Sequence, residues 1–223
     1  GHYRYNAGSH QLRLDGVQVA DGRYQGQVEL QGAAPMAIDA QLRGEVRAPM
    51  VEGSAPLTVL AEAAVRGQLA QPDGQLKVTG QVAPVGGDDG MRATLDADIA
   101  PWQTQPVLRA LADFQRIDAA RFVPGAPRTD LSGTLRAGPV PSATPGAATA
   151  WQAELQARNA LPGPWDQKRL PLAGVQATAR LDGQDWTVPQ AELELGKGRI
   201  ALQASYTPQP MPWQAEARLE RVQ

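Results

Sequence analysis

Apolar and polar residues alternate along most of the chain with a period of two. In residues 91–99 every odd position is apolar and every even position is polar, and residues 151–157 and 213–219 repeat this arrangement. Alternation of this kind places apolar side chains on one face of an extended strand and polar side chains on the other. The pattern therefore predicts many β-strands, even though the frequent Ala and Glu residues favour helices by propensity.

Turn residues separate the alternating runs. Asp-Gly steps occur at residues 15–16, 21–22, 73–74 and 182–183, and a Gly-Lys-Gly segment occupies residues 196–198. Asp-Gly supplies the positive φ that tight hairpins require, so these steps predict short connections between antiparallel neighbours. No strand–helix–strand pattern is present, and we therefore do not expect a parallel α/β sheet.

Two stretches depart from the alternation. Residues 106–122 fit either a short helix, with Val107, Leu111 and Phe114 at helical spacing, or a strand followed by one helical turn. Residues 122–150 are rich in Pro, Gly, Ala and Thr. This composition predicts a loop or crossover, interrupted by one short strand at residues 131–135.

Similar alternating runs begin near residues 91, 151 and 213, and the second and third share the sequence Trp-Gln-Ala-Glu. Either chance or a structural repeat of about 60 residues explains them. We interpret residues 3–222 as one continuous β-groove segment of a longer protein. Residues 1–2 are left out of the fold prediction as an expression remnant.

Small side chains dominate the predicted inward positions, because Ala accounts for 37 of the 223 residues and aromatic residues for only 5%. The facing layers of a β-sandwich fill a space about 10 Å thick, and Ala-rich faces would leave costly voids there. We therefore predict an all-β fold, with a long and mostly antiparallel sheet curled into an open trough with an apolar interior. About 14 to 18 strands are expected, and a β-sandwich is the alternative.

Residues suited to catalysis or metal binding are scarce. The 21 basic and 23 acidic residues nearly balance, which argues against a nucleic-acid binder. Cys is absent, which excludes thiol catalysis and thiolate metal sites. His2 and His10 are the only histidines, too few for a metal site, and no Gly-x-Ser-x-Gly motif occurs. We expect no enzymatic activity, no catalytic residue, no cofactor and no metal.

Three segments resemble the TamB/AsmA-like family, which includes the inner-membrane subunit of the translocation and assembly module. Residues 117–135 contain an Asp-led turn, an Ala-Pro step and the sequence Leu-Ser-Gly-Thr-Leu. Residues 159–172 are similar to the next element of that family, and residues 195–204 resemble a recurring Gly-containing strand pair, with Ala204 where Gly is usual. The resemblance extends over residues 90–222.

This resemblance implies the periplasmic part of an inner-membrane-anchored envelope protein of a Gram-negative cell. Such a segment would shield phospholipid acyl chains in an apolar groove between the inner and outer membranes, and so contribute to outer-membrane biogenesis. The implied partners are phospholipid and, through regions outside this segment, a TamA-like outer-membrane barrel; nucleic acid is not expected. The alternative is a scaffold or chaperone module for the assembly of autotransporter-type outer-membrane proteins.

The apolar phase of the alternation predicts which side chains line such a groove. They are Leu76, Val78, Leu95, Ile99, Leu155, Leu181, Leu193, Leu195, Ile200 and Leu202. The five Trp residues would either contact lipid or cap the ends of the apolar layer. Because an open sheet has two unpaired edges, we also expect self-association through those edges.

Overall fold

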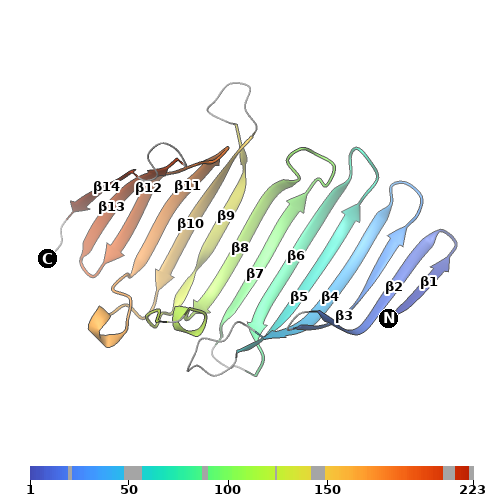
Figure 1. Ribbon diagram of the computed structural model, residues 1–223, viewed down its shortest axis with the longest axis horizontal. Helices are drawn as coiled ribbons and strands as arrows, with labels where there is room; N and C mark the ends of the chain where they lie inside the picture. Colours follow the sequence, from blue (N-terminus) through green and yellow to red (C-terminus); the bar gives the residue numbers. More distant parts are fainter. Residues whose placement is uncertain are drawn as a thin grey trace. The chain divides into compact units, whose positions relative to one another are not determined.

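The computed structural model describes residues 1–19, 22–47, 57–86, 90–123, 125–141, 149–207 and 214–220. Fourteen strands and two short 3₁₀ helices, η1 (Ala119–Arg121) and η2 (Trp165–Gln167), make up its regular structure (Figure 1). The strands are β1 (His2–Asn6), β2 (Ser9–Val19), β3 (Gly22–Gln31), β4 (Ala37–Arg47), β5 (Thr58–Gln68), β6 (Gln75–Pro84), β7 (Arg92–Ile99), β8 (Val107–Ile117), β9 (Leu131–Val140), β10 (Ala150–Asn159), β11 (Gly174–Asp182), β12 (Asp185–Leu195), β13 (Gly198–Tyr206) and β14 (Gln214–Glu220).

The strands follow one another in the sheet in the order of the chain. Short connections dictate this order, because a hairpin can join only neighbouring antiparallel strands. In the described residues β1 pairs with β2 and β14 pairs with β13, so the sheet does not close into a barrel. The prediction of an all-β, open, antiparallel sheet is confirmed, and the β-sandwich alternative is wrong because the strands form a single sheet.

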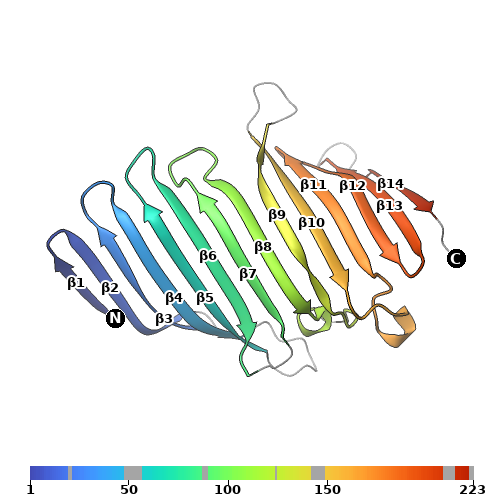
Figure 2. The same ribbon diagram turned by 180° about the vertical axis from the view of Figure 1, so that it is seen from behind.

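The chain divides into two compact units, Gly1–Ala110 and Leu111–Gln223, with the boundary inside β8. We call them the first unit and the second unit. Views from opposite sides show that no helical layer lies on either face of the strands within each unit (Figures 1 and 2). Each unit is therefore a single-layered sheet as far as the described residues go.

The Asp15-Gly16 step lies inside β2 as a β-bulge, and the prediction of a hairpin turn there is wrong. The pairing of β2 with β3 shifts register between Leu14 and Val17, and Gly16 adopts a positive φ of 68°. Strand β3 is long enough to pair with both halves of β2, so the left-handed glycine bends the strand instead of reversing it. The bulge keeps Leu14 and Val17 on the same face although they are three residues apart.

Replacing Gly16 with Ala tests this bulge. We expect the substitution to lower the free energy of unfolding by about 1–2 kcal/mol, since a side chain at positive φ is strained, and the added Cβ would lie 3.0 Å from Arg23 Nε. Urea titration followed by circular dichroism measures the effect. Gly80→Ala is the control, because its Cβ would stand 3.7 Å from Leu95 Cβ, an ordinary contact. Equal effects of the two substitutions would contradict the strained bulge.

Residues 106–122 form a strand followed by a helical turn, which confirms that alternative and makes the short helix wrong. Strand β8 ends at Ile117, and η1 begins directly after Asp118. The Asp118 carboxylate caps η1 by accepting a hydrogen bond from the amide of Ala120 at 3.2 Å. Arg116 has a φ of 54°, and this left-handed residue precedes the end of β8.

Strand β9 is longer than predicted, because it extends from Leu131 to Val140 instead of stopping at residue 135. Its ten residues pair throughout with β10, and this pairing carries β9 through Pro139, which lies opposite Trp151. The steps at residues 182–183 and 196–197 do form tight hairpins, with positive φ at Gly183 and Gly196. The step at residues 73–74 lies in the β5–β6 connection, whereas residue 21 lies outside the described residues.

The three runs that suggested a repeat of about 60 residues fall in β7, β10 and β14. In the order of the sheet, β10 comes three strands after β7, and β14 comes four strands after β10. The spacing between the runs, counted in strands, is therefore not constant. The repeat remains a prediction. His2 is the first residue of β1, although it was left out of the fold prediction.

Candidate functional site

The strand registers assign every paired residue to one of two faces of the sheet. In the first unit, the face that contains Val78 carries no Asp, Glu, Lys or Arg among its described residues, and we call it the uncharged face of the first unit. It comprises Tyr3, Tyr5, His10, Leu12, Leu14, Val17, Gly22, Tyr24, Gly26, Val28, Leu30, Ile38, Ala40, Leu42, Gly44, Val46, Val59, Ala61, Ala63, Val65, Gly67, Leu76, Val78, Gly80, Val82, Pro84, Ala93, Leu95, Ala97 and Ile99.

The second unit has a face of the same kind around Leu155. From β9 to β13 its described residues again include no Asp, Glu, Lys or Arg, and we call it the uncharged face of the second unit. It comprises Leu131, Gly133, Leu135, Ala137, Pro139, Trp151, Ala153, Leu155, Ala157, Asn159, Val175, Ala177, Ala179, Leu181, Trp186, Val188, Ala191, Leu193, Leu195, Gly198, Ile200, Leu202, Ala204 and Tyr206.

The structure places all ten predicted groove residues on these two faces. Leu76, Val78, Leu95 and Ile99 lie on the uncharged face of the first unit, in β6 and β7. Leu155, Leu181, Leu193, Leu195, Ile200 and Leu202 lie on the uncharged face of the second unit, in β10 to β13. Their contact with lipid remains a prediction.

Neither uncharged face is covered by another layer of the described chain. The buried positions on the two faces are mostly small residues such as Ala40, Ala97 and Ala191, and no bulky side chain of the described residues is fully buried. Leu95 keeps 42% of its surface exposed, and Val82, Leu135 and Trp186 are also exposed. A sheet ordinarily packs its apolar face against a second layer of helices or strands. Neither uncharged face has such a layer in the described structure.

The opposite face of the sheet carries the charges. In the first unit the Arg66 guanidinium lies 3.1 Å from the Asp39 carboxylate, and Lys77 Nζ lies 3.1 Å from Asp96. Arg109 binds both Asp96 and Asp98, at 2.7 and 2.9 Å. These ion pairs cross between neighbouring strands and are exposed, so they contribute little to stability. They mark this face as the one that water covers.

Two pKa shifts on the charged face follow from these contacts. The hydrogen bond from Lys77, together with the nearby positive charges, lowers the pKa of Asp96 below its ordinary value. The hydrogen bond and the negative charge of Asp98 raise the pKa of Arg109. Both groups therefore stay charged across the physiological range.

Small residues make the uncharged face of the first unit shallow. The Tyr24 ring of β3 lies against Gly44 of β4, where any added Cβ would collide with it. The ring thus lies along the sheet instead of standing away from it. Gly80 and Ala63 face each other on the neighbouring strands, which adds another shallow position. Such a surface offers broad apolar contact and few obstacles.

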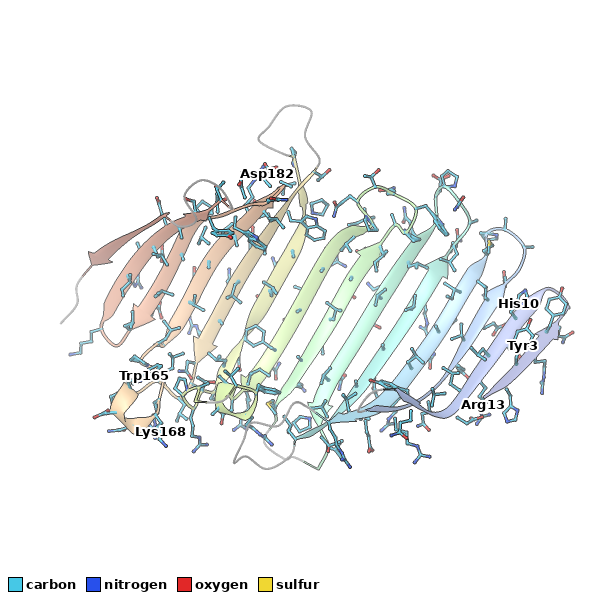
Figure 3. All side chains as sticks on the ribbon, viewed as in Figure 1. Tyr3, His10, Arg13, Trp165, Lys168 and Asp182 are labelled. Atoms are coloured by element: carbon cyan, nitrogen blue, oxygen red, sulfur yellow. The ribbon has the colours of Figure 1, made fainter. Side chains whose placement is uncertain are left out.

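His10 is a feature of the uncharged face that the sequence analysis missed. His10 lies two residues before Leu12 and four before Leu14, so the alternation of the sequence already places it on their face. In the structure it lies opposite Leu30 of β3. The Tyr3 hydroxyl is 2.8 Å from His10 Nδ1, and the Tyr5 ring centroid is 5.0 Å from that of His10. Tyr3 and Tyr5 belong to edge strand β1 and His10 to β2. Figure 3 shows Tyr3 and His10 at this edge of the first unit.

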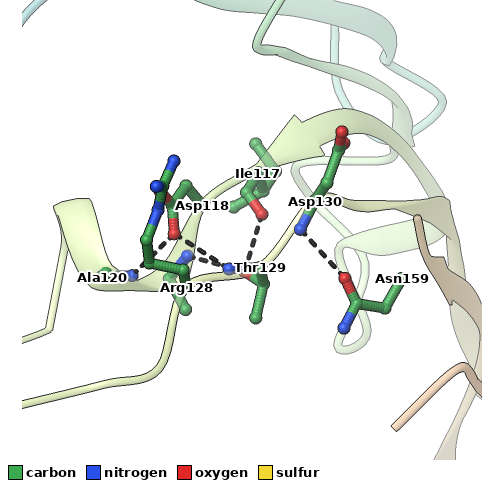
Figure 4. Close-up of polar contacts among 8 residues, drawn as sticks. Ile117, Asp118, Ala120, Arg128, Thr129, Asp130 and Asn159 are labelled. Carbon is green, nitrogen blue, oxygen red and sulfur yellow. Dashed lines mark hydrogen bonds and ion pairs between the residues drawn. The ribbon is translucent and has the colours of Figure 1, made fainter. Parts of the chain in front are cut away.

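A buried polar cluster fixes the loops at one end of the second unit (Figure 4). Thr129 and Asn159 are only 4% and 5% exposed. The Thr129 hydroxyl donates to the Ile117 carbonyl at 2.9 Å and accepts from the Ala119 amide at 2.8 Å. The Asp118 carboxylate accepts from the Thr129 amide at 3.0 Å. Every buried polar side-chain atom in the described residues has a hydrogen-bond partner.

Asn159 uses both ends of its side-chain amide in this cluster. Its Oδ1 accepts hydrogen bonds from the amides of Asp130 and Leu161, at 3.0 and 3.1 Å. Its Nδ2 donates to the carbonyls of Leu172 and Leu170, at 3.0 and 3.4 Å. One residue at the end of β10 therefore holds the chain before β9, the chain after β10 and the chain before β11.

The described residues contain no group of three or more His, Cys, Asp or Glu side chains that could hold a metal ion. No helix within the described ranges is both long and apolar enough to span a membrane. No known protein family, curated protein or solved structure matches this chain. The two uncharged faces are therefore the candidate functional sites.

Proposed function

We propose that the uncharged faces bind the acyl chains of phospholipids, and that the protein is a lipid-transfer segment of a periplasmic, inner-membrane-anchored envelope protein. One observation carries this proposal. In each unit, one face of the strands is uncovered and has no formally charged residue, while the other face of the same strands is charged. The sequence resemblance to the TamB/AsmA-like family supports the same conclusion.

The chemistry of the face favours an acyl chain over an extended protein segment. Neighbouring strands already pair their backbone groups across each unit. A single extended polypeptide lying flat on the face would therefore bury N–H and C=O groups without hydrogen-bond partners, which costs free energy. An acyl chain has no such groups, and each buried CH₂ contributes about 0.8 kcal/mol.

Transport between membranes follows from this mode of binding. The charged side of the strands remains in water while acyl chains lie on the other side, so the sheet shields one side of the acyl chains from solvent when a lipid leaves a bilayer. In the envelope of a Gram-negative cell this activity would supply the outer membrane, with a TamA-like barrel as the partner at that membrane.

The second candidate function is a scaffold for outer-membrane protein assembly, and the open edge at β1 favours it. Strand β1 pairs with residues 9–13 of β2, which leaves the outer side of the later residues of β2 without a strand partner in the described structure. A client strand could add to this edge by backbone pairing. The expected self-association through sheet edges would use the same groups.

Photo-crosslinking separates the two functions. A photoreactive residue at Leu95 or Leu193, on the uncharged faces, should capture phospholipid in cells, and mass spectrometry would identify the adduct. The controls are Thr94 and Glu192, which lie one residue away on the charged side of the same strands. Equal lipid capture on both sides, or none at Leu95 and Leu193 in a functional protein, would refute the lipid-binding proposal and favour the scaffold.

A further inference from the structure

Two connections at one end of the second unit are joined into a single structure, which we call the double loop. It consists of residues 118–123 and 125–130 from the β8–β9 connection, and residues 160–173 from the β10–β11 connection. Arg128 and Arg169 form a parallel β-bridge, and the Arg128 amide donates to the Lys168 carbonyl at 2.8 Å. The buried hydrogen bonds of Thr129 and Asn159 anchor both connections to the ends of the strands. These bonds restrict the conformations open to the double loop.

The double loop displays bulky apolar side chains to solvent. Trp165 is 64% exposed and Val123 is 54% exposed, and Phe122 beside it is also exposed. No strand pairing or register requires these residues to be apolar. Bulky apolar groups on a preorganised loop lose little entropy when they enter a second phase, which makes them suited to an interface.

Cations accompany these apolar groups. The double loop contains Arg121, Arg128, Lys168 and Arg169, and Figure 3 shows Lys168 beside Trp165 at this end of the strands. Its three carboxylates are placed differently: Asp118 caps η1 and lies 3.7 Å from the Arg128 guanidinium, Asp130 lies 3.6 Å from the Arg116 guanidinium, and Asp166 of η2 is exposed. Four cations against three carboxylates leave a small excess of positive charge in the double loop. At the other end of the strands the β11–β12 hairpin instead carries Asp182 and Asp185.

We infer that the double loop docks the second unit on the surface of a bilayer that contains anionic phospholipid. Trp rings prefer the interfacial region of a bilayer, Phe rings enter its apolar side, and Lys and Arg side chains are attracted to anionic lipid headgroups. The combination of Phe122, Val123 and Trp165 with neighbouring cations matches both requirements. The interaction does not depend on acyl-chain binding by the uncharged faces, so the two proposals stand or fall separately.

The absence of Cys from the sequence makes a local test possible. Val123→Cys, labelled with the environment-sensitive fluorophore NBD, should gain intensity and shift to the blue with vesicles of phosphatidylcholine and phosphatidylglycerol in a ratio of about 7:3. Val85→Cys, in the β6–β7 connection of the first unit, is the matched control because Val85 is 47% exposed. Its label should not respond.

A loss-of-function variant completes the test. Phe122→Ser combined with Trp165→Ser should lower the affinity for these vesicles at least about tenfold in flotation assays, whereas Val85→Ser should leave it unchanged. Circular dichroism checks that the double variant keeps its sheet. A silent label at residue 123, an equal response at residue 85, or unchanged affinity of the double variant would overturn the inference. A label at residue 123 that responds to a protein but not to vesicles would assign the double loop to a protein partner and would also overturn it.

Discussion

Replacing Leu155 with Arg is expected to reduce phospholipid binding by the second unit about a hundredfold. Leu155 lies on the uncharged face between Leu135 of β9 and Ala177 of β11. A guanidinium among acyl chains costs about 3 kcal/mol even when its stem reaches toward water, and this corresponds to about a hundredfold in affinity. Titration of the 223-residue chain with a pyrene-labelled phospholipid measures the change.

The same substitution should leave the fold nearly intact. In the absence of lipid the uncharged face is open to water, so the introduced guanidinium would remain hydrated and the free energy of unfolding would change by less than about 1 kcal/mol. Gln156→Arg is the matched control, because Gln156 lies on the charged side between Thr134 and Gln176, with no charged residue directly opposite. If both variants bind lipid equally well, acyl chains do not occupy this face.

Replacing Asn159 with Ala should lower the free energy of unfolding of the second unit by about 2–4 kcal/mol. The substitution removes the acceptor for the amides of Asp130 and Leu161 and the donor to the Leu172 carbonyl. Buried polar groups left without partners cost about 1–3 kcal/mol each, and part of this cost is recovered where water can enter. Urea titration followed by tryptophan fluorescence measures the loss.

Two further substitutions make this result specific to the hydrogen bonds. Asn159→Asp keeps the acceptor oxygen but turns a second oxygen toward the carbonyls of Leu170 and Leu172, so it should also destabilise. Gln156→Ala, on the exposed side of the same strand, should change the free energy of unfolding by less than about 0.5 kcal/mol. A loss no larger for Asn159→Ala than for Gln156→Ala would show that the cluster does not hold the loops.

The alternation by itself predicted strands, faces and fold class. Each strand displays its side chains to opposite sides with a period of two, so the apolar phase at Leu193 and Leu195 defines one face without any knowledge of the neighbouring strands. The high Ala content argued against a two-layered core for the same local reason. All ten predicted groove residues consequently lie on the uncharged faces, although their role in binding lipid remains a prediction.

Long-range pairing decided what the alternation left open. Asp15-Gly16 has the local chemistry of a turn, yet β3 pairs on both sides of it and makes it a bulge. Residues 107–117 fit a helix or a strand locally, and a strand alone lets Arg109 reach Asp96 and Asp98 of β7. Backbone hydrogen bonds with a neighbouring strand decide between turn and bulge, or between helix and strand. A local sequence pattern does not show which strand will be the neighbour.

The sequence therefore determined which side of each strand is apolar, because that property depends only on the order of residues along the strand. The tertiary structure decided that no described layer covers this side, and that Thr129 and Asn159 join two distant loops into one platform. Both results depend on which segments meet in space. Thr129 and Asn159 are thirty residues apart in the chain, and the pairing of β9 with β10 is what brings their loops to the same end of the sheet.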